Sequence, residues 1–400
     1  MMLLFAAIVT FADVQPVLQQ RCVVCHRPGE IGPMPLGNYK QARPWAKAIL
    51  EAVKSKTMPP WFADERFGHF KNDPRLTPQE IETIQQWVAS GATEGPPPPP
   101  ARAWVVGWSI PKPDLILEMP QPVRVPVEGE LPYQHIVLKG QFKEDKWVTA
   151  VEVRPTDRSV VHHIVLYVRE PGNMWLAEAK PGVPLGKKSQ TTSDILTVYT
   201  PGQEPFRALE GMAKLIPAGS DLVLQIHYTP NGKAVADRTK IGLVFANSAP
   251  PQRVLTLQLG NGNINIPPGE ANYSLSRSGT LPNDCYLLNL FPHMHLRGKA
   301  FEYLLWREGG RGEMILRVSP YRFNWQLTYQ LPKPRFLAKG TRLVVTGYFD
   351  NSKNNKFNPD PDDEVHYGEQ SWEEMMIGFF DVAVPSSVDK VKFFLTEPRP

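Results

Sequence analysis

Two cysteines and a histidine near the start of the chain have the spacing of a covalent haem attachment site. Cys22 and Cys25 are separated by two residues, and His26 follows directly. In a Cys-x-x-Cys-His pattern both thiols form thioethers to the porphyrin, and the histidine becomes an axial ligand of the iron. The sequence therefore predicts one covalently bound haem c, a role in electron transfer and an exported protein.

The sixth ligand of the iron is predicted to be a methionine, because thioether sulfur stabilises reduced iron and raises its potential. Met58 is favoured, since an intervening helix lets the chain wrap the haem and return on its other face. Met34 stays open as the alternative, although it follows His26 by only eight residues. His69 is a weaker alternative, more typical of a surface histidine.

Two other interpretations of the cysteine pair fit the sequence less well. A zinc site needs a second pair of ligands, and the surrounding segment has none. A thiol redox motif is expected to open a helix after a strand, whereas the segment before Cys22 favours a helix. Haem attachment is the interpretation that the pattern favours.

Five further histidines form a second chemical pattern. His162 and His163 are adjacent within an apolar strand, His227 lies in another, and His293 and His295 form a His-x-His pair. A His-x-His pair on a strand points both imidazoles to one face, where they can chelate one metal ion. Consecutive residues point to opposite faces, so the adjacent pair can share a metal only at a bulge or a strand end.

Taken singly, each of these histidines is explained as well by a buried imidazole bonded to a carbonyl group. His135 and His366 are assigned to that ordinary class. The ordered combination His-His, His, His-x-His and Met in one chain favours metal binding for the remaining five.

This order closely resembles the copper type II ascorbate-dependent monooxygenases, the family of peptidylglycine alpha-hydroxylating monooxygenase and dopamine beta-monooxygenase. The resemblance extends roughly from Trp104 to the C-terminus. It implies two packed β-sandwiches, each with one copper on its facing surface. The matching motifs are Val161-His162-His163, Gln225-Ile226-His227-Tyr228, His293-Met294-His295 followed by Gly298-Lys299, and Glu373-Glu374-Met375.

The resemblance also implies a role for each copper. The histidine-only site would supply electrons, and three imidazoles suit a copper that cycles between two oxidation states. The second site would react with dioxygen and substrate, and its thioether favours Cu(I). Met376 replaces Met375 if the register slips. The implied ligands are His162, His163 and His227 for the first copper, and His293, His295 and Met375 for the second.

The predicted function is a copper-dependent monooxygenase that hydroxylates a C–H bond of a small organic substrate with dioxygen. Relatives in animals draw electrons from ascorbate, whereas here the haem, reduced by an unidentified donor, is expected to supply them. A haem on the same chain raises the effective concentration of reductant at the copper. The alternative is a non-catalytic electron-transfer or copper-binding carrier with a haem c domain.

Three positions depart from the peptide-amidating members of the family. Phe291, Ile377 and Phe379 stand where those enzymes have the arginine, asparagine and tyrosine that anchor a peptide carboxylate. Peptide amidation is therefore not expected. The three side chains are predicted to line an apolar pocket instead.

The elements that position these residues change character at the proline run 96–100, which is expected to form a stiff spacer. Before it, the segment 44–56 has helical spacing, and Thr77-Pro78-Gln79-Glu80 is a capping box that starts a second helix. After it, short apolar runs broken by Pro, Gly, Asn and Asp predict antiparallel strands. The clearest are 147–153, 160–168, 222–228, 285–294 and 341–349.

The predicted fold class is a small all-α cytochrome c module followed by two antiparallel β-sandwich domains of jelly-roll type. The junction between the sandwiches is placed at 247–251. The expected domains are a signal peptide or anchor at 1–12, a cytochrome c domain at 13–95, a linker at 96–103 and copper monooxygenase sandwiches at 104–249 and 250–400.

Composition adds few constraints. The 400 residues carry a formal charge of +4 without a polybasic block, so neither nucleic acid nor a charged membrane surface is a predicted partner. The apolar segment 1–12 resembles a signal peptide or uncleaved anchor, which favours a periplasmic or other extracytoplasmic location. No later run is apolar for about 18 residues, so no further membrane span is expected. Cys285 stands alone, so disulfides do not hold the fold together.

Overall fold

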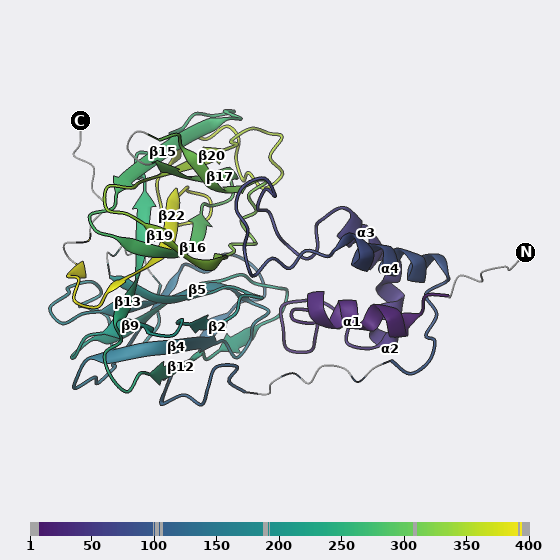
Figure 1. The fold of residues 1–400 in the computed structure, drawn as a ribbon, viewed down its shortest axis with the longest axis horizontal. Helices are drawn as coiled ribbons and strands as arrows, with labels where there is room; N and C mark the ends of the chain where they lie inside the picture. The colour runs from purple at the N-terminus through teal and green to yellow at the C-terminus, as the bar shows by residue number, and fades with distance from the viewer. Residues whose placement is uncertain are drawn as a thin grey trace, which may run out of the picture. The chain divides into compact units, whose positions relative to one another are not determined.

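The computed structural model describes residues 8–98, 100, 104, 107–186, 191, 193–306, 310–390 and 393. Contacts divide the chain into two units (Figure 1). The first unit comprises Met1–Trp61, Asp73–Gly107 and Asp157–Val160, and the second comprises Phe62–Asn72, Trp108–Thr156 and Val161–Pro400. Pro99 of the predicted proline spacer lies outside the described residues.

The first unit is built from short helices around one apolar core. Helix α4 packs against α1 and α3 (Figure 1). Thr77 and Glu80 cap the start of α4 reciprocally, which confirms the capping box that the sequence predicted. Phe11, Leu18, Ile84 and Trp87 are buried in the core. The elements are α1 (Phe11–Arg21), α2 (Tyr39–Ala42), the 3-10 helix η1 (Arg43–Trp45), α3 (Ala46–Lys54) and α4 (Pro78–Ala89).

The predicted fold class is wrong in its first part. The described part of the chain is mostly β-sheet, its helices are few and short, and it shows no evident all-α cytochrome c module. Helices cover well under half of the first unit, because glycine and proline interrupt the long connections 22–38 and 55–77. This part of the chain is a small, loop-rich helical unit, whereas the β-rich remainder fits the predicted class.

The beginning of α1 overlaps the segment that the sequence analysis assigned to a signal peptide or anchor. Residues 1–7 of that segment lie outside the described residues. Thr10 and Asp13 form a capping box, and Phe11 packs against the rings of Tyr39 and Trp87 at 5.7 and 5.9 Å. Phe11 is therefore a core residue of the first unit. Among the described residues, no helix has the length and apolar character needed to cross a membrane.

The second unit contains two β-regions. We call the strands β1 to β12 the N-terminal β-region; its five-stranded sheet has the order β6-β3-β10-β5-β7. A second sheet contains β1, β12, β4 and β9, with β8 paired to β4. The strands are β1 (Leu115–Glu118), β2 (Val123–Val125), β3 (Gln134–Leu138), β4 (Lys146–Arg154), β5 (Val161–Arg169), β6 (Leu185–Gly186), β7 (Asp194–Tyr199), β8 (Phe206–Arg207), β9 (Met212–Ile216), β10 (Asp221–Tyr228), β11 (Val235–Asp237) and β12 (Lys240–Phe245).

The C-terminal β-region comprises β13 to β22. Strands β13, β22, β16 and β19 continue the second sheet of the N-terminal β-region, because β13 pairs in parallel with β9. A separate four-stranded sheet has the order β15-β20-β17-β18. The strands are β13 (Gln252–Gly260), β14 (Asn265–Ile266), β15 (Tyr273–Thr280), β16 (Cys285–His293), β17 (Gly298–Trp306), β18 (Glu313–Val318), β19 (Tyr329–Leu337), β20 (Arg342–Phe349), β21 (Val365–His366) and β22 (Ile377–Pro385).

The five strands that the sequence predicted most clearly are all present. They correspond to β4, β5, β10, β16 and β20, with ends that differ by one residue or less from the prediction. Because side chains alternate between the two faces of a strand, these registers decide which histidines point the same way.

One segment from the predicted cytochrome range belongs to the second unit. Ala63 forms an isolated bridge with Val318 of β18, and the amide of Lys71 donates to the carbonyl of Gln330 in β19 at 2.9 Å. The ring of Phe70 packs edge-on against Tyr329 at 5.3 Å. Phe62–Asn72 thus lies along the C-terminal β-region, while the residues on either side of it cluster with the first unit.

Candidate metal centre

An irregularity in the pairing of β5 with β10 brings the adjacent histidines to one side. His227 pairs with His163, but the next residue, Tyr228, pairs with Val161. His162 is therefore the extra residue of a bulge, which breaks the alternation of side chains at this point. This is the arrangement that the sequence analysis required for two adjacent histidines to share a metal ion.

The first histidine set, His162, His163 and His227, is compact. Its ring centroids are 5.0 to 5.2 Å apart, and one ligand atom from each ring lies within 4.8 Å of the others. The Nδ1 atoms of His162 and His163 are 3.0 Å apart. Two nitrogens that each lie about 2.0 Å from a common ion have a separation of this size.

The second histidine set, His293 and His295, lies at the end of β16. The Nδ1 atom of His293 is 2.7 Å from the amide oxygen of Gln326. The Nδ1 atom of His295 is 3.0 Å from the carbonyl oxygen of Glu373. When Nδ1–H donates to such an oxygen, the ring orientation is fixed and Nε2 is left as the metal-binding atom.

Glu374 holds the backbone around His295. Its two carboxylate oxygens accept hydrogen bonds from the amides of His295, at 2.9 Å, and Arg297, at 2.6 Å. Burial raises the pKa of Glu374 to about 8, although these donors oppose the rise. Arg297 is itself buried, and its guanidinium donates to Asn351 at 2.7 Å and to the carbonyl of Trp372 at 2.7 Å.

The backbone register favours Met375 over Met376 beside the second histidine set. Met376 packs over Gly347 of β20, where an added Cβ would lie 2.7 Å from its Cγ. In extended chain the preceding side chain points the other way. His293 pairs with Ile377, so the same antiparallel register continued by two residues brings Met375 opposite His295. The ligand role of Met375 stays a prediction.

Phe323, in the second unit, contacts histidines of both sets. Its ring stacks on His162, with centroids 4.7 Å apart and planes 22° apart, and packs edge-on against His295 at 6.1 Å. The ring centroids of His163 and His293 are 6.2 Å apart. The five histidines therefore form one continuous cluster, which arises from residues that are distant in sequence.

Burial keeps these imidazoles neutral. It lowers the pKa of His162 and of His293 to about 4 and that of His295 to about 3. The pKa values of His163 and His227 fall well below the ordinary value, because burial and neighbouring histidines both disfavour the charged form. A metal ion binds only the neutral imidazole, so the cluster is held in its ligand form.

Unpartnered ring nitrogens test whether the cluster suits a metal. His162 Nε2, His227 Nδ1 and His295 Nε2 are buried and have no hydrogen-bond partner among the described residues. Buried polar atoms are normally paired, so an orphan nitrogen in each set calls for a missing partner. Imidazole nitrogens are ligands that copper accepts. The histidines of both sets fit copper.

The remaining predicted site residues lie in the first unit. Cys22 ends α1, and the amides of Cys25 and His26 both donate to its carbonyl, at 3.1 and 2.9 Å. This turn holds the three motif residues together. His26 Nδ1 is 3.1 Å from the carbonyl oxygen of Met34, which leaves Nε2 as its binding atom. The residues fit a covalent haem.

The environment of the two thiols disfavours a redox-active pair. Burial raises the pKa of Cys22 to about 12 and that of Cys25 to about 11. Reactive cysteine pairs instead have lowered pKa values, since the thiolate is the nucleophile. Met34 packs on the apolar core of the first unit, and Met58 follows α3, where its amide donates to the carbonyl of Ala52 at 3.2 Å. His69 is exposed, as the sequence analysis expected.

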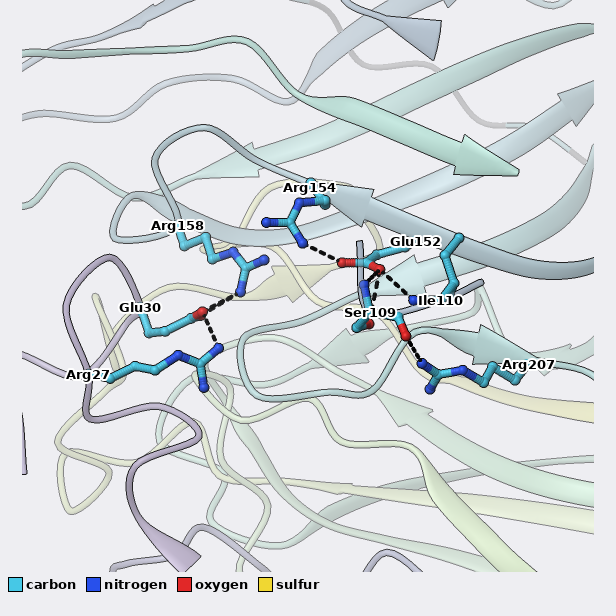
Figure 2. A network of polar contacts seen from close by, with 8 residues as sticks. All are labelled: Arg27, Glu30, Ser109, Ile110, Glu152, Arg154, Arg158 and Arg207. Atoms are coloured by element: carbon cyan, nitrogen blue, oxygen red, sulfur yellow. Dashed lines mark hydrogen bonds and ion pairs between the residues drawn. The ribbon is translucent and has the colours of Figure 1, made fainter. Parts of the chain in front are cut away.

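A network of charged residues follows the Cys-x-x-Cys-His motif in the first unit (Figure 2). Glu30 accepts hydrogen bonds from Arg27 at 2.6 Å and from Arg158 at 2.6 and 2.7 Å. In the second unit, Glu152 accepts from the amides of Ser109 and Ile110, at 2.6 and 3.1 Å (Figure 2). The latter contacts fix the chain that enters the N-terminal β-region.

Residues 254–380 match the family described as "Copper type II ascorbate-dependent monooxygenase, C-terminal domain". This segment is therefore similar to the C-terminal domain of that family. The chain is also similar to DBH-like monooxygenase protein 2 of Mus musculus, with 26% identity over 213 residues, covering 48% of this chain and 34% of the mouse protein. The match thus spans about a third of the length of this relative.

Two solved structures of viral proteins show only distant similarity. The STIV MCP has a TM-score of 0.29 with 11% identity, over 68% of this chain and 95% of that chain. PBCV-1 VP54 has a TM-score of 0.26 with 8% identity, over 71% of this chain and 97% of that chain. Similarity at this level supports no conclusion about the fold or the function.

The segment 254–380 also contains the three positions at which the sequence departs from peptide-amidating enzymes. The rings of Phe291 and Phe379 stack at 5.8 Å, and Phe379 is 6.4 Å from the ring of His293. Ile377 pairs with His293 across β16 and β22. Phe291 and Phe379 line a cavity.

Sequence reasoning missed several residues of the centre. Phe323 and Gln326 lie in the connection between β18 and β19 and carry no motif. Tyr133, whose ring is 4.6 Å from that of His227, is equally unmarked in the sequence. Glu374 lies within a quoted motif, yet only the structure reveals its bonds to the His295 backbone. His135 is buried near Gln225 and His366 is exposed, so neither is in the cluster.

Proposed function

We propose that this chain is a copper-dependent monooxygenase that hydroxylates a C–H bond of a small organic substrate. The overall reaction consumes one dioxygen, two electrons and two protons, and it yields an alcohol and water. The observation that carries the proposal is the convergence of five imidazoles from two β-regions, three of them buried and two half-buried, into one cluster beside Phe323. The family match of residues 254–380 supports the same chemistry.

Copper, when bound, would supply the one-electron redox steps and the activation of dioxygen. His162, His163 and His227 would hold the electron-supplying ion, and His293, His295 and Met375 the oxygen-activating one. The protein supplies rigidity: Gln326 and the carbonyl of Glu373 fix the second histidine set, and the bulge at His162 fixes the first. Burial around the rings excludes water from the site.

We also propose that a haem c bound through Cys22, Cys25 and His26 supplies the electrons, after reduction by a separate donor. The motif spacing and the orientation of His26 toward the carbonyl of Met34 support this assignment. Met58 is proposed as the sixth ligand. An exported, extracytoplasmic location follows from haem attachment and remains part of the proposal.

Metal and haem content provide the first test. Full-length protein purified from cells that attach haem c should contain two coppers and one iron per chain by elemental analysis. The pyridine haemochrome spectrum should show a haem that stays with the polypeptide after acid–acetone extraction. Protein that takes up no copper after reconstitution would contradict the monooxygenase proposal.

Dioxygen uptake separates an enzyme from a carrier. The wild type should reoxidise its reduced haem and release a hydroxylated product when dioxygen and substrate are added. Met375→Ala should retain haem and lose product formation, because the oxygen-activating copper loses its thioether ligand. Met314→Ala, on strand β18, is a matched control that should leave turnover unchanged. Reoxidation without any product in the wild type would instead support the carrier.

A further inference from the structure

A cavity of about 380 Å³ is lined in part by Asn289 and Phe291 of β16 and by Phe379 and Asp381 of β22. Asn289, Phe291 and His293 alternate along β16, and β22 pairs with them residue by residue. Asn289 faces Asp381, Phe291 faces Phe379, and His293 faces Ile377. Phe291 and Phe379 therefore lie between the metal centre and a polar group of residues at Asp381.

The polar group, which we call the Lys214 cluster, consists of Lys214, Thr256, Asn289 and Asp381, all of which line the cavity. Lys214 Nζ donates to Thr256 Oγ1 at 2.8 Å and lies 3.6 Å from Asp381 Oδ2. Thr256 Oγ1 donates to Asp381 Oδ1 at 2.6 Å, and the Asn289 amide donates to Asp381 Oδ2 at 2.9 Å.

The charges of the Lys214 cluster balance each other. Lys214 and Asp381 are only 5% and 7% exposed, so each would be strongly unfavourable without the other. A carboxylate ligand placed here would be repelled by Asp381, and an ammonium ligand would be repelled by Lys214. A neutral group that both donates and accepts hydrogen bonds, such as a hydroxyl or an amide, meets neither penalty.

Distance along the sheet relates this cluster to the metal centre. Asn289 and His293 are four residues apart on β16, which corresponds to about 13 Å at about 3.3 Å per residue. The stacked rings of Phe291 and Phe379 cover the intervening surface. The volume lies toward the lower end of the range of about 300–1,000 Å³ found for small-molecule sites.

We propose that this cavity binds the substrate of the oxygenase, a neutral amphipathic molecule. Its apolar body lies on Phe291 and Phe379, and its neutral hydrogen-bonding group contacts the Lys214 cluster. The C–H bond to be hydroxylated then lies about 13 Å from that group, close to His293. This assignment rests on the proposed function, because it names the substrate class of the same reaction.

The test compares three probes that differ only in their terminal group: 6-phenylhexan-1-ol, 6-phenylhexanoate and 6-phenylhexylamine. Their binding to the full chain loaded with Cu(I) is measured by calorimetry without dioxygen, so that no turnover occurs. The alcohol should bind at least tenfold more tightly than either charged probe. Equal binding of all three, or tighter binding of a charged probe, would overturn the proposal.

Two substitutions should shift the preference in opposite directions. Asp381→Asn leaves the charge of Lys214 unbalanced, so the affinity for the carboxylate probe relative to the alcohol should rise at least tenfold over that of the wild type. Lys214→Met leaves the charge of Asp381 unbalanced, so the relative affinity for the amine probe should rise by a similar factor. General destabilisation cannot produce opposite shifts. Phe336→Ala, an exposed position on β19 outside the cavity, should retain the wild-type ranking.

Failure of this inference can be distinguished from failure of the proposed function. If either charge variant fails to fold, the ranking of the three probes on the wild type still decides the proposal. If the alcohol is preferred but no product forms with dioxygen, the cavity assignment stands and the monooxygenase proposal fails. If product forms from other substrates while the ranking fails, only the cavity assignment is wrong.

Discussion

Arg158 donates hydrogen bonds to both carboxylate oxygens of Glu30, at 2.7 and 2.6 Å. Glu30 follows His26 by four residues, and Arg158 precedes His162 by four. The side chains are 15% and 20% exposed, so the pair is largely shielded from water. Both residues belong to the first unit, where this contact joins the loop after the Cys-x-x-Cys-His motif to the segment 157–160 (Figure 2).

Removing this pair should destabilise the protein measurably. In a double-mutant cycle of Glu30→Gln and Arg158→Met, the coupling energy should be about 1–2 kcal/mol, because shielded, charge-assisted hydrogen bonds exceed exposed ones. Urea unfolding measures each free energy. The more exposed pair Glu313 and Arg335 is the control, with a coupling expected below about 1 kcal/mol. Equal coupling in both cycles would contradict the expectation.

The same pair should affect electron delivery if the proposed haem is present. Arg158→Met should slow reoxidation of the haem by dioxygen and substrate, because the loop after His26 loses its anchor. Stopped-flow absorbance at the haem bands measures the rate, and elemental analysis must show unchanged iron and copper. Arg335→Met, whose pair lies on β18 and β19, should reoxidise at the wild-type rate. An unchanged rate in Arg158→Met would show that the pair of Glu30 and Arg158 does not contribute to electron delivery.

The sequence predicted where the strands of the candidate site lie in the chain better than how these strands pair and which side chains meet. Alternation of apolar residues located β5, β10 and β16, because a half-buried strand imposes a period of two on its own sequence. From the sequence, a bulge at His162 was only a requirement for His162 and His163 to share a metal ion. Its presence depends on how β10 pairs with β5. The helices α3 and α4 were evident from spacing and capping, yet the predicted all-α class overlooked how much of that unit is loop.

Residues that act through tertiary contacts left no signal in the sequence. Phe323 resembles any loop phenylalanine until its ring is seen on His162. Lys214 and Asp381 are 167 positions apart in the chain, and a single buried lysine in an apolar strand has no sequence signature of its partner. Such pairs follow from the order of strands in the sheet, which local patterns do not encode.

Loss of one ligand should remove one metal and spare the other. His227→Ala should reduce copper from two ions to one per chain, because two imidazoles at the bulge cannot replace the third ligand. Elemental analysis after dialysis against Cu(I) and a weak chelator measures the content. His366→Ala removes an exposed histidine outside the cluster and should retain both coppers. Two tightly bound coppers in His227→Ala would exclude His227 as a ligand.

Loss of a partner behind a ligand should weaken binding without abolishing it. Gln326→Leu removes the oxygen 2.7 Å from His293 Nδ1, so the ring is free to rotate. The affinity of the second histidine set for copper should fall about 10- to 100-fold. Competition with a Cu(I) chelator measures the affinity. Gln330→Leu, on the nearby β19, is the matched amide control, and equal losses in both variants would assign the effect to general destabilisation.

An ion pair at the opposite end of the β5 and β10 pairing should make stability depend on pH. Burial disfavours ionised Asp221, but hydrogen bonds from Arg169, at 2.7 Å, and Lys139, at 2.9 Å, outweigh it and lower the pKa of the carboxyl group. Because the pKa of Asp221 is lower in the folded state, the pair stabilises the protein at pH values above the unfolded-state pKa of about 3.9. That stability is lost as the pH falls through the folded-state pKa.

Asp221→Asn should therefore be less stable than the wild type at neutral pH by about 1–2 kcal/mol. The difference should shrink as the pH falls below about 4. Urea unfolding from pH 7 to pH 3 measures both curves, and curves that stay parallel over this range would show that Asp221 does not contribute in this way.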